Sequence, residues 1–193
     1  MTGRQFPAWA VTVVMLAVLV GAGLGVNALE ANAPPNGPIG VRMTLGRDSV
    51  VHPLQVNVSG ARAYETILDE DENPLETVGV WVLVDLSYAT TDEPSLPGDF
   101  VLVDERGRRY PITGRDFGEW FASPDLWHRG TLAFEVPLDA LGDLTFEAWP
   151  SGLGPGSDTP MPYAVLALRV DPGTVEPGPG VVEEPELLPV GER

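Results

Sequence analysis

The chain has 193 residues, and its 11 basic residues, all of them arginine, are outnumbered by 28 acidic ones, so the formal net charge is −17. This surplus of negative charge argues against nucleic acid as a partner and against docking on anionic lipid, since both need clustered basic side chains. The sequence contains no cysteine, which excludes a disulfide framework, a thiolate nucleophile, a cysteine-ligated metal and a lipidated cysteine anchor.

The first prominent feature is an uncharged segment near the N-terminus. Residues 8–29 read AWAVTVVMLAVLVGAGLGVNAL, and as a helix they would span about 33 Å, close to the hydrocarbon thickness of a bilayer. Arg4 precedes this segment and Glu30 follows it, so the positive-inside rule places residues 1–7 in the cytoplasm. The sequence therefore predicts a single transmembrane helix over residues 8–29, with the rest of the chain outside the cytoplasm.

A cleaved signal peptide is the alternative reading of the same segment. Signal peptides have an apolar core of about 7–15 residues, and this one is longer. Cleavage could follow Ala28 or Ala33, although Pro34 directly after Ala33 disfavours the second site. Under either interpretation the remainder of the chain is exported.

Proline and glycine mark both ends of the exported part. Residues 30–40 read EANAPPNGPIG and are predicted to form an extended linker. Residues 171–193 read DPGTVEPGPGVVEEPELLPVGER, and their acidic, proline-rich composition predicts a disordered tail. The folded domain is therefore expected over residues 41–170.

Within residues 41–170, apolar side chains recur at every second position, which is the period of a β-strand. In VGVWVLVDLSY, Val82 and Val84 share one face, while Trp81 and Leu83 share the other. A run that is apolar on much of both faces is typical of a central strand. Further runs of this kind are VRMTL, LQVNVSGARAY, FVLV, TLAFEV, LTFEAW and AVLALRV. About seven short strands separated by turn residues predict an all-β, antiparallel sandwich.

Two of these segments carry a resemblance to a known family. In FVLVDERGRRY the matching positions are Phe100, Leu102, Asp104, Gly107 and Tyr110, and in GTLAFEVP they are Gly130, Leu132, Phe134, Val136 and Pro137. Over about residues 50–170 the chain resembles the telokin-like, immunoglobulin-like extracellular domain of bacterial lipoproteins and membrane proteins, a domain of unknown function. The resemblance implies an immunoglobulin-like sandwich that a lipid or a membrane helix anchors, and it implies no catalytic residue.

An acidic stretch, ILDEDENPLETVGV, begins like a calcium-binding loop. Asp69 and Asp71 stand at alternate positions, as in an EF-hand. An EF-hand loop counted from Asp69 would need glycine where Pro74 stands and glutamate where Val80 stands. The stretch is therefore interpreted as a solvated loop between two strands, with a weak calcium site formed by Asp69, Asp71 and Glu76 as the alternative.

Aromatic residues gather in FGEWFASPDLW, which follows the predicted hairpin. Such residues either cap an open end of the sandwich or form a binding surface. If the domain binds a partner, the candidate contact residues are Trp120, Phe121 and Trp127.

The sequence shows no constellation typical of catalysis. The two histidines, His52 and His128, stand apart from each other, and no G-x-S-x-G, H-E-x-x-H or phosphate-binding loop occurs. The charged run from Asp104 to Arg109 is interpreted as a solvated turn with weak ion pairs. We therefore expect no catalytic residue, no metal and no cofactor.

These features predict a single-pass protein of the bacterial cell membrane. Its exported, immunoglobulin-like domain would be a non-enzymatic binding or interaction module. The expected partner is a protein or glycan of the cell envelope, and not a nucleic acid. The alternative is a secreted, soluble protein that acts as a ligand carrier or antigen-like factor after signal cleavage.

Overall fold

The structure is a computed structural model, and the chain forms two compact units, residues 1–36 and 37–193. It describes residues 9, 13, 15–20, 37–68, 72–113, 121–157 and 159–193. Within the first unit, residues 9, 13 and 15–20 are helical. Among the described residues, no helix is both long enough and apolar enough to cross a bilayer. Most of the predicted transmembrane segment 8–29, and all of residues 1–7, lie outside the described residues.

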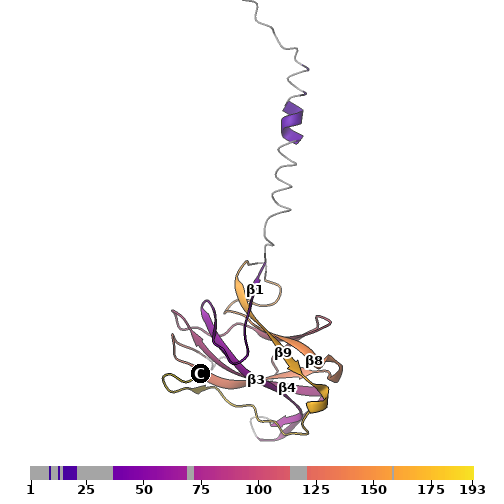
Figure 1. Ribbon diagram of the computed structural model, residues 1–193, viewed down its shortest axis with the longest axis vertical. Helices are drawn as coiled ribbons and strands as arrows, with labels where there is room; N and C mark the ends of the chain where they lie inside the picture. The colour runs from indigo at the N-terminus through magenta and orange to yellow at the C-terminus, as the bar shows by residue number, and fades with distance from the viewer. Residues whose placement is uncertain are drawn as a thin grey trace, which may run out of the picture. The chain divides into compact units, whose positions relative to one another are not determined.

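The second unit is an all-β sandwich of two five-stranded sheets (Figure 1). Sheet A has the order β1-β9-β8-β5-β6, and sheet B has the order β10-β7-β4-β3-β2. The strands of sheet A are β1 (Ile39–Arg42), β9 (Pro162–Val170), β8 (Gly142–Ala148), β5 (Phe100–Asp104) and β6 (Arg109–Pro111). Those of sheet B are β10 (Glu186–Leu187), β7 (His128–Val136), β4 (Pro74–Thr90), β3 (Leu54–Leu68) and β2 (Ser49–Val51).

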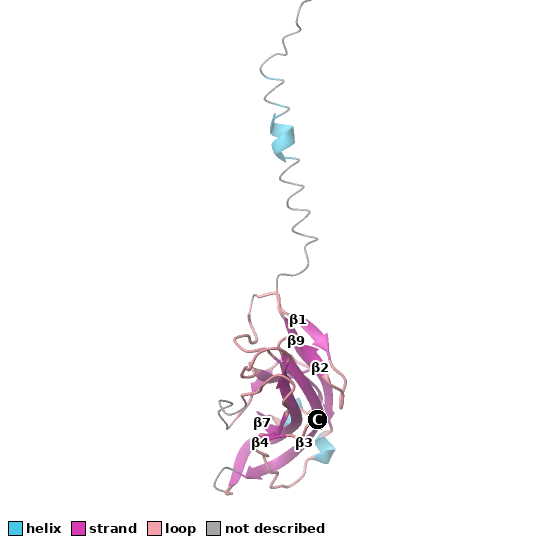
Figure 2. Cartoon of the chain, turned by 90° about the vertical axis from the view of Figure 1, so that its left-hand side faces the viewer, coloured by secondary structure: helices cyan, strands magenta, loops and turns pink. Residues whose placement is uncertain are grey.

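In the described residues of this unit, helical structure is confined to short turns, as Figure 2 shows. These are the 3-10 helices η2 (Leu138–Ala140) and η3 (Pro172–Thr174). Neighbouring strands within each sheet are antiparallel, except that β1 runs parallel to β9. The predicted two-sheet, all-β architecture is confirmed.

The core lies where the inward faces of the two sheets meet. Val82, Val84 and Leu86 of β4 are completely buried, as their alternation predicts. Phe134 of β7 packs edge-to-face on Phe146 of β8, with ring centroids 6.3 Å apart, and so joins the two sheets. Burying each side chain of this size contributes about 1.5–3 kcal/mol, so the alternating apolar pattern accounts for the assembly of the sandwich.

The hairpin predicted around DERGRR is present as β5 and β6. Gly107 has φ of +76° there, a conformation that glycine adopts without steric cost. Pro111 lies in β6, which is an edge strand of sheet A. This position suits a residue that cannot donate a ladder hydrogen bond.

The folded unit is larger than predicted at both ends. Strand β1 begins at Ile39, inside the expected linker 30–40. The tail 171–193, expected to be disordered, instead packs on sheet B and supplies β10 (Figure 1). The tail contains few apolar residues, and this composition led to the prediction of disorder. The prediction was wrong because the tail packs on apolar patches of the outer face of sheet B, which its own composition does not reveal.

Candidate functional site

Of the three aromatic residues predicted to form a contact surface, one is buried and one is exposed. Trp127 is 2% exposed, because Leu188 of the tail packs against it and the guanidinium of Arg193 stacks 4.6 Å from its ring centroid. Phe121 is 55% exposed, and Trp120 lies outside the described residues. Trp127 therefore belongs to a cap, the first of the two interpretations of this stretch, while Phe121 and Trp120 remain predicted contact residues.

The calcium candidate is only partly described. Glu76 lies on β4 opposite Thr66 of β3 and lines a shallow pocket of about 560 Å³ together with Glu65. Asp69 and Asp71 lie outside the described residues. Within the residues that the structure describes, no three acidic or histidine side chains stand close enough to hold a metal ion.

The two histidines lie at different places in the sandwich. His52 Nδ1 is 3.2 Å from a carboxylate oxygen of Asp92 and 3.1 Å from the hydroxyl of Thr91, at an exposed position. His128 stands on β7 opposite Leu187 of β10, and burial lowers the pKa of its imidazole. His52 is therefore an exposed residue paired with Asp92. His128 is a strand residue of sheet B.

Asp104 organises the β5–β6 turn. Its side chain is 2% exposed and accepts hydrogen bonds from the backbone N–H groups of Arg106 at 2.9 Å and Arg108 at 2.8 Å. It also accepts from Arg108 Nε at 2.6 Å and from the hydroxyl of Tyr110 at 3.1 Å. Desolvation raises the pKa of Asp104, but these donors, led by Arg108, outweigh it and bring the pKa to about 2. The sequence interpretation of a solvated turn is therefore wrong for this carboxylate, which is buried and fully engaged.

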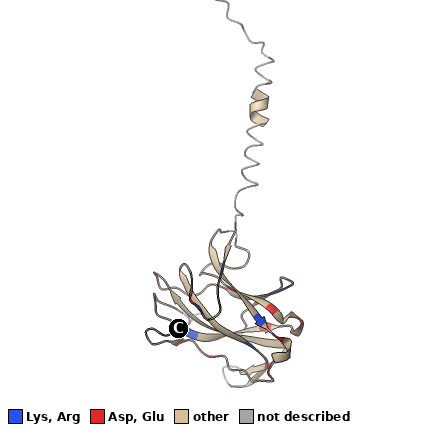
Figure 3. Ribbon diagram, in the orientation of Figure 1, with Lys and Arg blue, Asp and Glu red and all other residues tan. Residues whose placement is uncertain are grey.

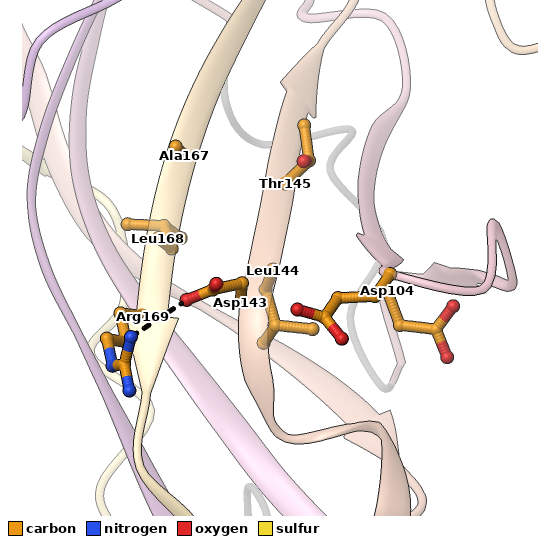
Figure 4. A pocket seen from close by; sticks show the side chains of 8 residues that line it. Asp104, Asp143, Leu144, Thr145, Ala167, Leu168 and Arg169 are labelled. Atoms are coloured by element: carbon orange, nitrogen blue, oxygen red, sulfur yellow. Dashed lines mark hydrogen bonds and ion pairs between the residues drawn. The ribbon is translucent and has the colours of Figure 1, made fainter.

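A shallow pocket of about 410 Å³ opens beside this turn, between the ends of β5, β8 and β9 (Figure 4). Glu105, Asp143 and Arg169 line it together with Asp104. Asp143 accepts from Arg169 at 3.4 Å, the contact dashed in Figure 4, and Asp104 is held by Arg108. Two of the three carboxylates at this pocket, Asp104 and Asp143, are thus each paired with an arginine.

A second polar cluster lies on the outer face of sheet A. Glu147 of β8 is 5% exposed and accepts from Arg109 Nη1 of β6 at 2.7 Å and from Trp149 Nε1 at 3.1 Å. The indole of Trp149 stacks on Tyr163 of β9, with centroids 3.9 Å apart and planes 4° apart. Burial, and then the nearby Glu147 carboxylate, raise the pKa of Tyr163.

Part of this cluster could be predicted from the sequence. The alternation in LTFEAW places Glu147 and Trp149 on the same face of one strand. Arg109 and Tyr163 come from other strands, β6 and β9. That these strands lie near β8 depends on the sheet order, which cannot be predicted from a local sequence pattern. The cluster joins three strands of sheet A and is consistent with a structural role.

Charges of both signs are spread through the sandwich. In the part of the chain that the structure describes, arginine segments are few and lie among acidic ones (Figure 3). Several of these neighbours form ion pairs, including Arg62 with Asp85 at 3.0 Å and Arg106 with Asp139 at 2.6 Å. The described arginines therefore form no basic stripe of the kind that tracks a phosphate backbone.

The fold defines the class of this chain as a two-sheet β-sandwich protein. The sequence matches no protein-family model and none of the curated proteins compared with it. Among solved structures it is similar to the crystal structure of an uncharacterized β-sandwich protein from Clostridium difficile 630. That likeness has a TM-score of 0.48 and 9% identity, and covers 70% of this chain and 99% of the other.

Proposed function

We propose that this protein is a single-pass membrane protein that holds a non-enzymatic, immunoglobulin-like interaction domain outside the cytoplasm of a bacterial cell. The observation that carries the proposal is the uncharged segment 8–29. Its described residues are helical and expose large apolar side chains, among them Trp9 at 70%, Leu16 at 58% and Leu19 at 68%. Apolar side chains exposed to this extent are stable in lipid, and in water they would need cover.

The strand order supports the immunoglobulin-like part of the proposal. In immunoglobulin domains one sheet has the order A-B-E-D and the other contains C, F and G. Here β3, β4 and β7 take the positions of A, B and E, while β5, β8 and β9 take those of C, F and G. Strand β10 lies beside β7, where D would lie, but it follows β9 in the chain and is therefore an addition to that pattern. This correspondence also favours the telokin-like, immunoglobulin-like family as the origin of the domain.

The charged groups favour an interaction module over an enzyme. Asp104 is engaged by Arg108, and Glu147 by Arg109 and Trp149. A catalytic acid or base needs a reacting group beside it, whereas these carboxylates already hold neighbouring strands together. A protein or glycan of the cell envelope is the proposed partner, because the acidic surface would repel anionic polymers.

Two measurements on the native protein test this function. Under the proposal, the chain stays in the membrane pellet after alkaline carbonate extraction, and its intact mass includes residues 1–33. Recovery of the protein from the medium, beginning after Ala28 or Ala33, would instead establish the secreted alternative.

A further inference from the structure

The C-terminal tail first pairs with the free edge of β3. The N–H of Glu176 donates to Ala63 O at 2.9 Å, and the N–H of Glu65 donates to Glu176 O at 2.8 Å. Four residues later the N–H of Gly180 donates to Thr66 O at 2.9 Å, and Leu68 N–H donates to Gly180 O at 3.0 Å. The tail thus binds as an added strand binds to a sheet edge.

The tail then crosses the outer face of sheet B. Gly180 lies so close to this face that a Cβ would stand 2.7 Å from the ring of Tyr64 and 3.0 Å from a methyl carbon of Leu83. Val182 packs against the same patch, which consists of Tyr64, Ile67, Trp81, Leu83 and Ala133. At the crossing there is therefore room only for glycine, and the patch contacts an aliphatic side chain two residues later.

Beyond the crossing, the tail follows the free edge of β7. Thr131 N–H donates to Glu183 O at 3.1 Å, β10 pairs with the start of β7, and Leu188 N–H donates to Trp127 O at 2.8 Å. Leu188 fills a second apolar patch, formed by Ala89 and Trp127. We name the two patches and the two strand edges together the tail groove.

Few side chains of the tail are buried in this groove, although Arg193 also pairs with Asp48 at 2.9 Å. Between residues 176 and 193, Gly180 and Leu188 are the buried residues, and Val182 and Pro185 are half-buried. The N–H of the Trp127 indole is buried with no acceptor among the described residues. A buried donor left in this state costs about 1–3 kcal/mol, so a different segment that offered an acceptor there would bind better.

We propose that the tail groove is a peptide-binding site which the chain's own tail occupies, and that an extended segment of a partner protein displaces it. The partner segment would present glycine at the crossing, an aliphatic residue eight positions later, and a hydrogen-bond acceptor beside Trp127. This inference rests on the proposed interaction function and names its surface. Because the tethered tail acts at an effective concentration on the order of millimolar, the groove is closed until such a partner arrives.

The test uses the full-length chain with the tail expelled by Val182→Asp and Leu188→Asp. The probe is a fluorescent peptide of residues 172–193. We expect the double variant to bind this peptide saturably and at least tenfold more tightly than the unaltered chain does. Val190→Asp is the matched control, because Val190 is fully exposed and its replacement should leave the groove closed. A folded double variant that binds no peptide would overturn the proposal.

Hydrogen exchange on the unaltered chain gives a second test, which does not depend on the variant folding. If the tail opens by itself, the amides of Gly180 and Leu188 exchange at least a hundredfold faster than those of Val82 and Phe134 in the core. The proposal would be overturned if the amides of the tail exchanged as slowly as those of the core, because both would then exchange only on global unfolding. Both experiments are independent of membrane topology, so their failure is distinguishable from failure of the proposed anchoring.

Discussion

At the scale of single residues, Asp104 makes the stability of the domain depend on acid. Its pKa in the folded chain is about 2, against an ordinary value of 3.8. A carboxyl whose pKa is lowered by folding stabilises the folded state above its unfolded pKa, and this contribution is lost as pH falls through the folded pKa. We therefore expect urea unfolding to show a loss of stability between about pH 4 and pH 2. The loss should be smaller in Asp104→Asn, and equal pH dependence in the two proteins would contradict this role.

Glu147 supports a second residue-scale prediction. Glu147→Ala would leave the Trp149 N–H buried without its acceptor and would remove the partner of Arg109. A buried donor without a partner costs about 1–3 kcal/mol, and we expect a loss of that order in urea unfolding. Glu147→Gln is the control, because its amide oxygen can still accept from the indole. A loss as large in the glutamine variant as in the alanine variant would show that charge, and not the acceptor, is what matters.

At the scale of elements, the pairing of β4 with β7 depends on Gly79. A Cβ at this position would collide with the carbonyl oxygen of Val136, so we expect Gly79→Ala to destabilise the domain by about 2 kcal/mol or more. Gly60 in β3 is a suitable control, because a Cβ there meets no atom within 4 Å. Thermal unfolding of both variants tests this prediction, which would be contradicted if the two lost the same stability.

At the scale of elements, individual strands could be predicted from the sequence, but the segments that cover them could not. Strand β4 could be predicted, with its apolar residues on both faces, because the period of two is local information. What covers the second face could not be predicted, since the answer is the tail, whose composition indicates disorder. Likewise Asp104 reads as a turn residue, while its burial depends on donors that only the folded hairpin aligns. Patterns within a strand are therefore readable, whereas contacts between distant segments require the sheet order.

At the scale of the whole molecule, the two ends of the chain carry the proposed function. The N-terminal segment would fix the protein in the membrane, and the tail would control access to a face of the exported domain. The two roles are physically separate, since one depends on residues 8–29 and the other on sheet B.

Cysteine labelling in intact cells would test whether the domain is anchored and faces outward. The chain has no cysteine of its own, so Thr2→Cys and Ser151→Cys each introduce a single reporter, the second at an exposed loop position. With a membrane-impermeant maleimide, we expect Ser151→Cys to be labelled in cells whose outer layers are permeable to the reagent. We expect Thr2→Cys to be labelled only after lysis. Labelling of Ser151→Cys only after lysis would contradict the proposed topology.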